Sequence, residues 1–291
     1  MLNVLSLFSG IGAFERAFEN VGIPFELLAY CERDPDASKS YSLIHGVPED
    51  MNLRDVMDID FLSVDEVVDF ICYGFPCQDI SNGGLQKGFF DENGERTRSG
   101  LFFEALRIID DYRPKFAIAE NVKALTHKKF TAEFNTVLES LEALGYVNYW
   151  AVLNGKDFGI PQNRERIFIV SIRKDIDRGF TFPSPIPLTL RLKDLLDDEV
   201  EERYYLSDET TKQLLLSAKV EIDSTARIRN ITPIERFRLM GFTDTDYIKC
   251  LEGGVDEREL EKQTGNSIIV PVIEAIYRSL GAVYEEFQPV N

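Results

Sequence analysis

Residues 3–12 read NVLSLFSGIG, an apolar run of strand length that passes directly into two glycines separated by one residue. A Gly-x-Gly turn after the first strand is where a Rossmann-like sheet binds a cofactor. The third glycine of the dinucleotide fingerprint is replaced by Glu15, whose carboxylate would repel a pyrophosphate at the helix start. Glu32 follows Gly12 at the distance of a ribose-binding acid. A phosphate-free cofactor such as S-adenosyl-L-methionine therefore fits best, and a plain tight turn at Gly10 and Gly12 is the alternative.

The rest of the first 173 residues alternates between strand and helix patterns. Further apolar runs of strand length lie at residues 26–32, 67–75, 116–121, 149–154 and 166–172. Between several of these runs, apolar residues recur with helical spacing, and each such stretch ends with a residue that terminates helices. The stretches are 13–22, 99–114 and 130–145. This alternation predicts an α/β fold with a doubly wound, mostly parallel, Rossmann-like sheet.

A proline-rich linker, FPSPIPL at 182–188, precedes a small second lobe. A capping box at Thr232 and Glu235, with Pro233 between them and Gly241 behind, predicts a short helix. A last helix is predicted within residues 265–281, with Pro271 in its first turns. We therefore expect a catalytic domain at 1–180 plus 264–291 and a small lobe at 181–263.

Bulk composition narrows the class of protein. The 291 residues are 44% hydrophobic, yet no apolar run reaches the ~18 residues that span a bilayer. The N-terminal run lacks the features of a signal peptide, so we expect a cytoplasmic protein without disulfides. The spacing of the four cysteines, Cys31, Cys72, Cys77 and Cys250, matches no metal site. A net charge of −18 argues, taken alone, against a polyanionic partner.

Three polar stretches carry the candidate chemistry. Cys77, in GFPCQDIS, follows a strand and a proline, which suits a nucleophile, although a packed cysteine is the alternative. Glu120 ends a buried strand, where burial would keep it partly protonated, as a general acid requires. The alternative is a solvated glutamate beside an Asn121 that caps a helix. Arg164 and Arg166 share one face of a strand, where their guanidinium groups could bind an anion or a carbonyl oxygen. The alternative is that they lie on a solvated strand edge.

Taken together, the motifs resemble those of the cytosine-5 DNA methyltransferases, the restriction-modification type of bacteria and phages. The chain carries, in the family's order, LFSGIGAFE, GFPCQDIS, ENVKAL, QNRERIF, RNITPIERFRLMGF and QTGNSIIV, over about 1–173 and 227–280. The resemblance implies that Cys77 attacks carbon 6 of a flipped-out cytosine and forms a covalent adduct. Glu120 would act on ring nitrogen 3, Arg166 would hold the base oxygen, and Arg164 would order the site and a nearby phosphate.

The resemblance also implies the binding residues. For S-adenosyl-L-methionine the family pattern falls on Phe8, Gly10, Gly12, Glu32, Asp55, Pro76, Leu101, Asn266 and Ser267. For nucleic acid it indicates Gln78, Ser81, Lys87, Arg96 and Arg98 in a polar catalytic loop, with Lys123, Lys128 and Lys129 after the acid. The expected partner is double-stranded DNA, with tRNA less favoured, no membrane and a monomeric enzyme.

The chain departs from the family pattern where the target-recognition region is expected. Only 53 residues, 174–226, separate the two blocks of motifs, and residues 191–225 hold 5 Lys or Arg against 10 Asp or Glu. A DNA-reading surface needs cations to neutralise phosphates. Four hypotheses follow: a DNA methyltransferase with a minimal recognition lobe, a tRNA cytosine methyltransferase, a core that binds the cofactor with little activity, and a non-catalytic dinucleotide-binding protein, which Glu15 disfavours.

Overall fold

The computed structural model describes residues 1–60, 63–76, 88–89, 91, 94–218 and 227–290. Six strands form one sheet in the order β2-β1-β3-β4-β6-β5. Their bounds are β1 Leu2–Leu7, β2 Phe25–Cys31, β3 Phe70–Tyr73, β4 Phe116–Val122, β5 Tyr146–Asn154 and β6 Glu165–Arg173. β2, β1, β3 and β4 are parallel, whereas β6 and β5 are antiparallel to their neighbours. The prediction of a mostly parallel, doubly wound sheet is confirmed.

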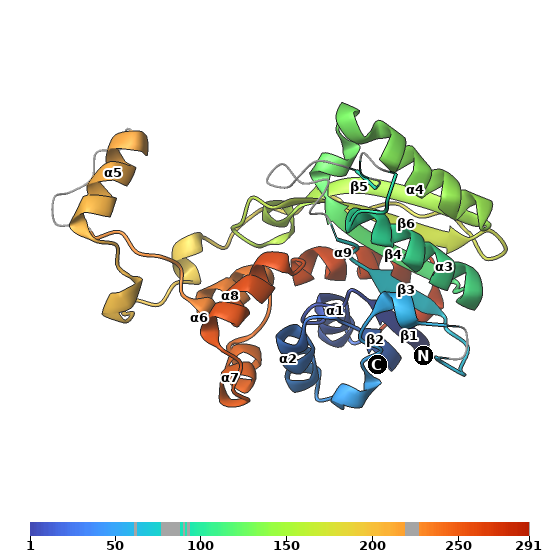
Figure 1. Ribbon diagram of the computed structural model, residues 1–291, viewed down its shortest axis with the longest axis horizontal. Coiled ribbons are helices and arrows are strands. Elements are labelled where there is room, and N and C mark those ends of the chain that lie inside the picture. Colours follow the sequence, from blue (N-terminus) through green and yellow to red (C-terminus); the bar gives the residue numbers. More distant parts are fainter. Residues whose placement is uncertain (61–62, 77–87, 90, 92–93, 219–226, 291) are drawn as a thin grey trace.

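Helices cover both faces of the sheet, as the nearly unbroken apolar strands require. Alternate strand residues point to opposite faces, so Val4 joins one apolar cluster and Leu5 the other. The first face packs against α1 (Ala13–Val21) and α9 (Val270–Gly281), and the second against α3 (Phe102–Tyr112) and α4 (Thr131–Ala143). Figure 1 shows this layering, with α3 and α4 together in green.

The residues predicted to cap and terminate helices do so in the structure. Gly22 terminates α1 with a left-handed φ of 76°. Thr232 and Glu235 form the capping box of α6 (Pro233–Met240), which ends at Gly241. Three further helices pack near them: α2 (Pro35–His45), α7 (Asp244–Glu252) and α8 (Glu257–Asn266). Apolar side chains of α6, α7 and α8 belong to the same buried cluster as α1 and α9, so one core runs through these helices.

One segment leaves the body of the molecule, residues 198–218 and 227–228, which we call the arm. It carries α5 (Asp208–Ala218), shown in orange in Figure 1 well away from the sheet. The base of the arm is fixed by charged groups of α6: Arg238 donates to the Leu195 carbonyl and to Asp197, and Arg229 pairs with the fully buried Glu235. Among the described residues, no helix combines the length and apolar character needed to span a bilayer.

Candidate active site

A cavity of about 860 Å³ opens at the carboxyl ends of the parallel strands. The chain runs from β1 to β2 on one side of β1 and then to β3 on the other, so the strand order reverses there. Open α/β sheets bind ligands at such a switch point. Residues directly after β1, β2 and β3, and Glu120 near the end of β4, all line this cavity.

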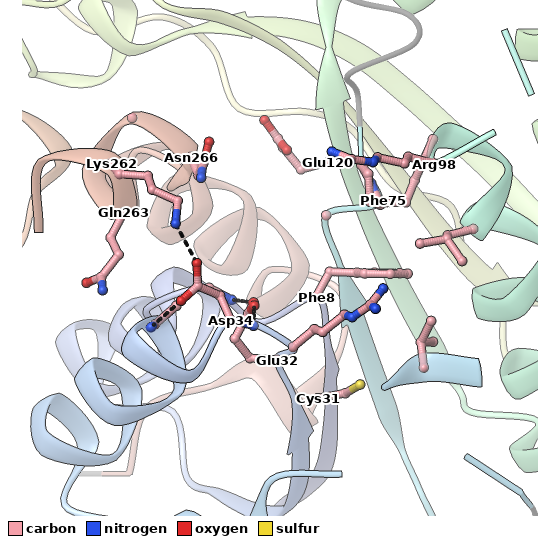
Figure 2. Close-up of a pocket in the computed structure, with 18 of the residues that line it drawn as sticks. Phe8, Cys31, Glu32, Asp34, Phe75, Arg98, Glu120, Lys262, Gln263 and Asn266 are labelled. Atoms are coloured by element: carbon pink, nitrogen blue, oxygen red, sulfur yellow. Dashed lines mark hydrogen bonds and ion pairs between the residues drawn. The ribbon is translucent and has the colours of Figure 1, made fainter. Parts of the chain in front are cut away.

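Glu32 is held in place by the turn that follows β1. Its carboxylate accepts hydrogen bonds from the backbone N–H groups of Gly10 and Asp34, both at 2.8 Å. Asn52 fixes its backbone through two further bonds. Burial raises the pKa of Glu32, and the two N–H donors oppose that rise. Each carboxylate oxygen accepts one bond within the protein, which leaves lone pairs for hydroxyl groups of a ligand. Figure 2 shows Glu32 beside Phe8 at the cavity.

Most of the predicted cofactor residues line the cavity: Phe8, Gly10, Glu32, Asp55, Pro76, Leu101 and Asn266. Gly12 and Ser267 are not among the lining residues; Gly12 instead caps α1 with a φ of 78°, and Ser267 is 7% exposed behind the wall. The expectation that the Glu15 carboxylate lies at the helix start, where it would repel a pyrophosphate, is wrong. Its side chain turns into the core, 1% exposed, where the Cys72 thiol contacts it at 3.7 Å.

Glu120 and Arg166 form an ion pair on the wall opposite Glu32. The Arg166 Nε lies 3.0 Å from Glu120 Oε1, and the side chains are 22% and 12% exposed. Burial raises the pKa of the Glu120 carboxyl, and the positive charges of Arg166 and Arg164 act against that rise. A carboxyl with a raised pKa and a cation beside it can donate a proton to a basic ring atom. Figure 2 shows Glu120 on the same side of the cavity as Arg98.

Arg164 fixes the segment that joins α8 to α9. Its Nη2 donates to the Gly265 carbonyl at 2.8 Å and to the Ser267 carbonyl at 2.7 Å. This segment carries Asn266, which lines the cavity. The guanidinium therefore connects the start of β6 to the cofactor side of the pocket, two residues from the arginine that pairs with Glu120.

The loop that leads to Cys77 is fixed at its start by the next strand. Asn121 is 2% exposed and donates to the Phe75 carbonyl at 3.0 Å, and the Glu120 carboxylate lies beside Gly74. The sequence offered only a helix-capping alternative for Asn121. The predicted residues Cys77, Gln78, Ser81 and Lys87 lie outside the described residues.

The predicted DNA-contacting cations have different surroundings. Arg98 lines the cavity, whereas Arg96 pairs with Glu104 at 2.7 Å and lies over the Phe103 ring. Lys123 donates to both carboxylate oxygens of Glu165 at 2.9 Å. Lys128 and Lys129 are exposed in the turn before α4.

Sequence reasoning missed several residues of the cavity. Arg54 lines it with a left-handed φ of 64°, which few residues other than glycine adopt. Lys262 of α8 bonds Asp34 at the start of α2 at 2.7 Å, a contact drawn in Figure 2. No local pattern indicates either residue, because each reaches the cavity only through the packing of distant segments.

Comparison with known proteins shows the family of this chain. Residues 2–226 and 218–282 match the family model described as C-5 cytosine-specific DNA methylase. The chain is 34% identical to the type II methyltransferase M2.ScrFI of Lactococcus lactis subsp. cremoris, over 96% of this chain and 99% of the relative. It is 35% identical to M.Bsp6I of Bacillus sp. (strain RFL6), over 96% and 100%. These alignments run over 361 and 329 positions, more than the 291 residues of this chain, so the relatives carry residues that it lacks.

Solved structures share the fold at lower identity. The S. pombe Dnmt2 methyltransferase aligns with a TM-score of 0.76 at 20% identity, covering 97% of this chain and 99% of that one. The Entamoeba histolytica methyltransferase EhMeth aligns with a TM-score of 0.76 at 19% identity, covering 97% and 98%. At this identity the likeness is one of fold.

Proposed function

The chain belongs to the C-5 cytosine-specific DNA methylase family, and from this premise we propose how its residues carry out the reaction. The enzyme methylates carbon 5 of cytosine in DNA, with S-adenosyl-L-methionine as cofactor. The observation that carries the proposal is the Glu120–Arg166 pair, which faces the same cavity as the Glu32 turn. A proton donor and a cofactor site thus share one pocket.

The cofactor fits the donor set on the β1–β2 side of the cavity. Glu32 is pre-ordered by two backbone N–H groups and has acceptor capacity left for the ribose hydroxyls. Asp55, whose carboxylate caps the short turn Val56–Asp58, is the acceptor for the adenine amine. The bound cofactor supplies an electrophilic methyl group on a sulfonium centre. Asn266, held by the Arg164 contacts on either side of it, closes the pocket from α8.

The base site lies on the β3–β4 side. Carbon 5 of cytosine is a poor nucleophile, and attack of the Cys77 thiolate at carbon 6 turns it into an enamine-like one. Glu120 donates its proton or a hydrogen bond to ring nitrogen 3, which neutralises the negative charge that the attack places on the ring; a donated proton returns to Glu120 when the product forms. Arg166 binds the base oxygen and keeps the glutamate oriented. After transfer a base removes the proton on carbon 5 and the thiolate leaves.

We infer that the substrate is double-stranded DNA and that the target base is flipped out, since a base inside a duplex cannot enter such a pocket. Arg98 at the cavity and the exposed Lys128 and Lys129 are the described cations best placed for phosphates. We propose residues 1–180 with 264–291 as the catalytic domain and a short recognition lobe within 181–263, whose helices α6, α7 and α8 pack into the same core as α1 and α9. The relatives named type II methyltransferases, which this chain matches over 96% of its length, support a restriction-modification role. We further propose that the enzyme is monomeric and cytoplasmic.

The test is transfer of a tritiated methyl group to mixed-sequence duplex DNA and, separately, to tRNA. Wild type labels the duplex, and Cys77→Ala labels neither substrate while it still binds S-adenosyl-L-methionine in calorimetry. A duplex with 5-fluorocytosine traps the wild-type adduct, because fluorine cannot leave as a proton. Full activity of Cys77→Ala refutes the covalent mechanism. Label on tRNA alone refutes the DNA assignment, and label on neither substrate leaves only a cofactor-binding core.

A further inference from the structure

His45 is a buried polar residue that none of the proposed catalytic steps uses. It is the last residue of α2, and its side chain is 3% exposed. Its ring lies directly against the Gly-x-Gly turn after β1, because a Cβ atom built on Gly12 would overlap the His45 Nε2. The glycine is therefore needed twice, for this contact and for its left-handed φ of 78°.

Both ring nitrogens of His45 face oxygen atoms that accept hydrogen bonds. Nε2 lies 3.2 Å from the Ile11 carbonyl oxygen, and Nδ1 lies 2.9 Å from the Glu19 carboxylate. A neutral imidazole carries one N–H and satisfies one of these acceptors, whereas the imidazolium satisfies both. The ring therefore bridges the turn and Glu19, with one acceptor oxygen at each ring nitrogen.

Charged groups from two helices surround this ring. Burial by itself raises the pKa of the Glu19 carboxyl, but its contacts with His45 and Arg16 outweigh burial and lower it. The Tyr41 ring lies against His45, tilted, with the ring centroids 4.7 Å apart, and Lys249 of α7 donates to the carbonyl of the preceding residue, Ile44.

The same cluster connects the turn to the C-terminal helices. Arg16 contacts Glu19 and also Asp246 of α7, both at 2.5 Å, and the Asp246 side chain is 3% exposed. A run of direct contacts therefore leads from the Ile11 carbonyl through His45, Glu19 and Arg16 to α7.

We propose that His45 is a positioning residue for the cofactor, which acts as an imidazolium that fixes the Ile11 carbonyl. Ile11 lies between the two glycines of the turn, and the Gly10 N–H orders Glu32. A fixed carbonyl keeps that N–H aimed at the carboxylate. The inference rests on the proposed placement of the cofactor at Glu32.

The experiment is calorimetric titration of the full chain with S-adenosyl-L-methionine from about pH 6 to about pH 9, the range in which an ordinary histidine loses its proton. His45→Gln keeps a polar side chain but no charge. We expect its dissociation constant to exceed that of wild type about fivefold at the acid end, the worth of one hydrogen bond, and to approach it at the alkaline end. His127→Gln, at the chain's second and exposed histidine, is the matched control and binds as wild type.

The ratio of the dissociation constants of His45→Gln and wild type tests the proposal. The amino group of the cofactor titrates in the same way with both proteins, so its effect cancels in this ratio. A ratio near one throughout, or a ratio that does not change with pH, overturns the proposal. Glu19→Gln leaves the ring in place and removes its counter-charge, so it reduces the pH dependence even if His45→Gln unfolds. Turnover at saturating cofactor stays within about twofold of wild type, because His45 touches no reacting group. Glu32→Gln tests the placement separately: if it binds as wild type, the proposed cofactor site fails whatever His45 does.

Discussion

Replacement of Glu120 by glutamine isolates the proton that the mechanism assigns to this side chain. Glutamine has the same shape and can donate an N–H to ring nitrogen 3, but it cannot transfer a proton. General acid catalysis contributes about 10²–10⁴-fold, so we expect kcat to fall within that range. Cofactor binding stays close to wild type, because Glu120 lies across the cavity from Glu32 (Figure 2).

The same substitution should change stability little. Glutamine keeps a carbonyl oxygen near the position where Glu120 Oε1 lies 3.0 Å from Arg166 Nε, and Arg166 keeps its bond from Nη1 to the Glu165 carbonyl. Because burial raises the pKa of Glu120, the ionised carboxylate is less favourable in the folded than in the unfolded protein, so the neutral glutamine should not lower the free energy of unfolding at neutral pH.

The pH dependence of stability has a definite sign. Burial raises the pKa of Glu120 above its ordinary 4.5, so the folded state binds more protons than the unfolded state above that pH. The contribution of Glu120 is complete below the unfolded pKa and declines as pH rises through the folded pKa. Glu120→Gln removes this decline, which urea unfolding at several pH values measures.

The assay is single-turnover transfer of a tritiated methyl group to duplex DNA, with calorimetry for the cofactor. Glu165→Gln is the matched control, because this half-buried glutamate pairs with Lys123 and is not among the residues that line the cavity. It should keep the wild-type rate. Retention of more than about a tenth of that rate by Glu120→Gln contradicts the acid role.

Three further predictions, which use four substitutions, test the frame around the site. Gly12→Ala should lower the free energy of unfolding by about 2 kcal/mol or more, because the backbone is left-handed and the new Cβ overlaps His45. Gly10→Ala has open space around it and should cost about 1 kcal/mol, so equal losses in urea unfolding would show that the overlap at Gly12 relaxes. Burial tends to raise the pKa of Glu235, but its arginine and backbone donors outweigh burial and hold the pKa at about 2. Glu235→Gln should therefore lower the free energy of unfolding by about 3 kcal/mol at neutral pH, and this difference from wild type should vanish as pH falls from about 4.5 to about 2. A difference that stays constant with pH would argue against the linkage. Arg164→Lys loses the bonds that Nη2 donates to the Gly265 and Ser267 carbonyls, so it should weaken cofactor binding several-fold with kcat nearly unchanged. A loss confined to kcat would instead place this arginine at the target base.

Local sequence signals predicted the strands, the helix ends and the edge of the sheet where the site lies. The carboxyl ends of parallel strands meet at one edge, so Glu32 and Glu120 could be assigned to it from their places in the chain. The directions of side chains were less predictable. Glu15 sits in the first turn of α1 yet points into the core, and the helical repeat alone does not show which way that turn faces. The contact of His45 with Ile11 joins residues 34 positions apart and has no local signature.

The acidic arm and the catalytic cavity are physically separate, and this separation bears on what a short recognition region changes. The residues that line the cavity come from strand ends, from the segments at 54–57 and 98–101, and from α2 and α8, whereas the described part of the arm contributes none. The base of the arm is fixed to α6 through Arg238 and Arg229, so shortening between these anchors leaves the packed helices in place. We therefore expect a shorter region to alter which cytosine is selected and how tightly DNA is bound, because phosphate contacts supply much of that affinity. The pairing of Glu120 with Arg166 and the Glu32 turn depend on contacts within the sheet and its covering helices, so we expect the proposed chemistry to be retained when recognition is reduced.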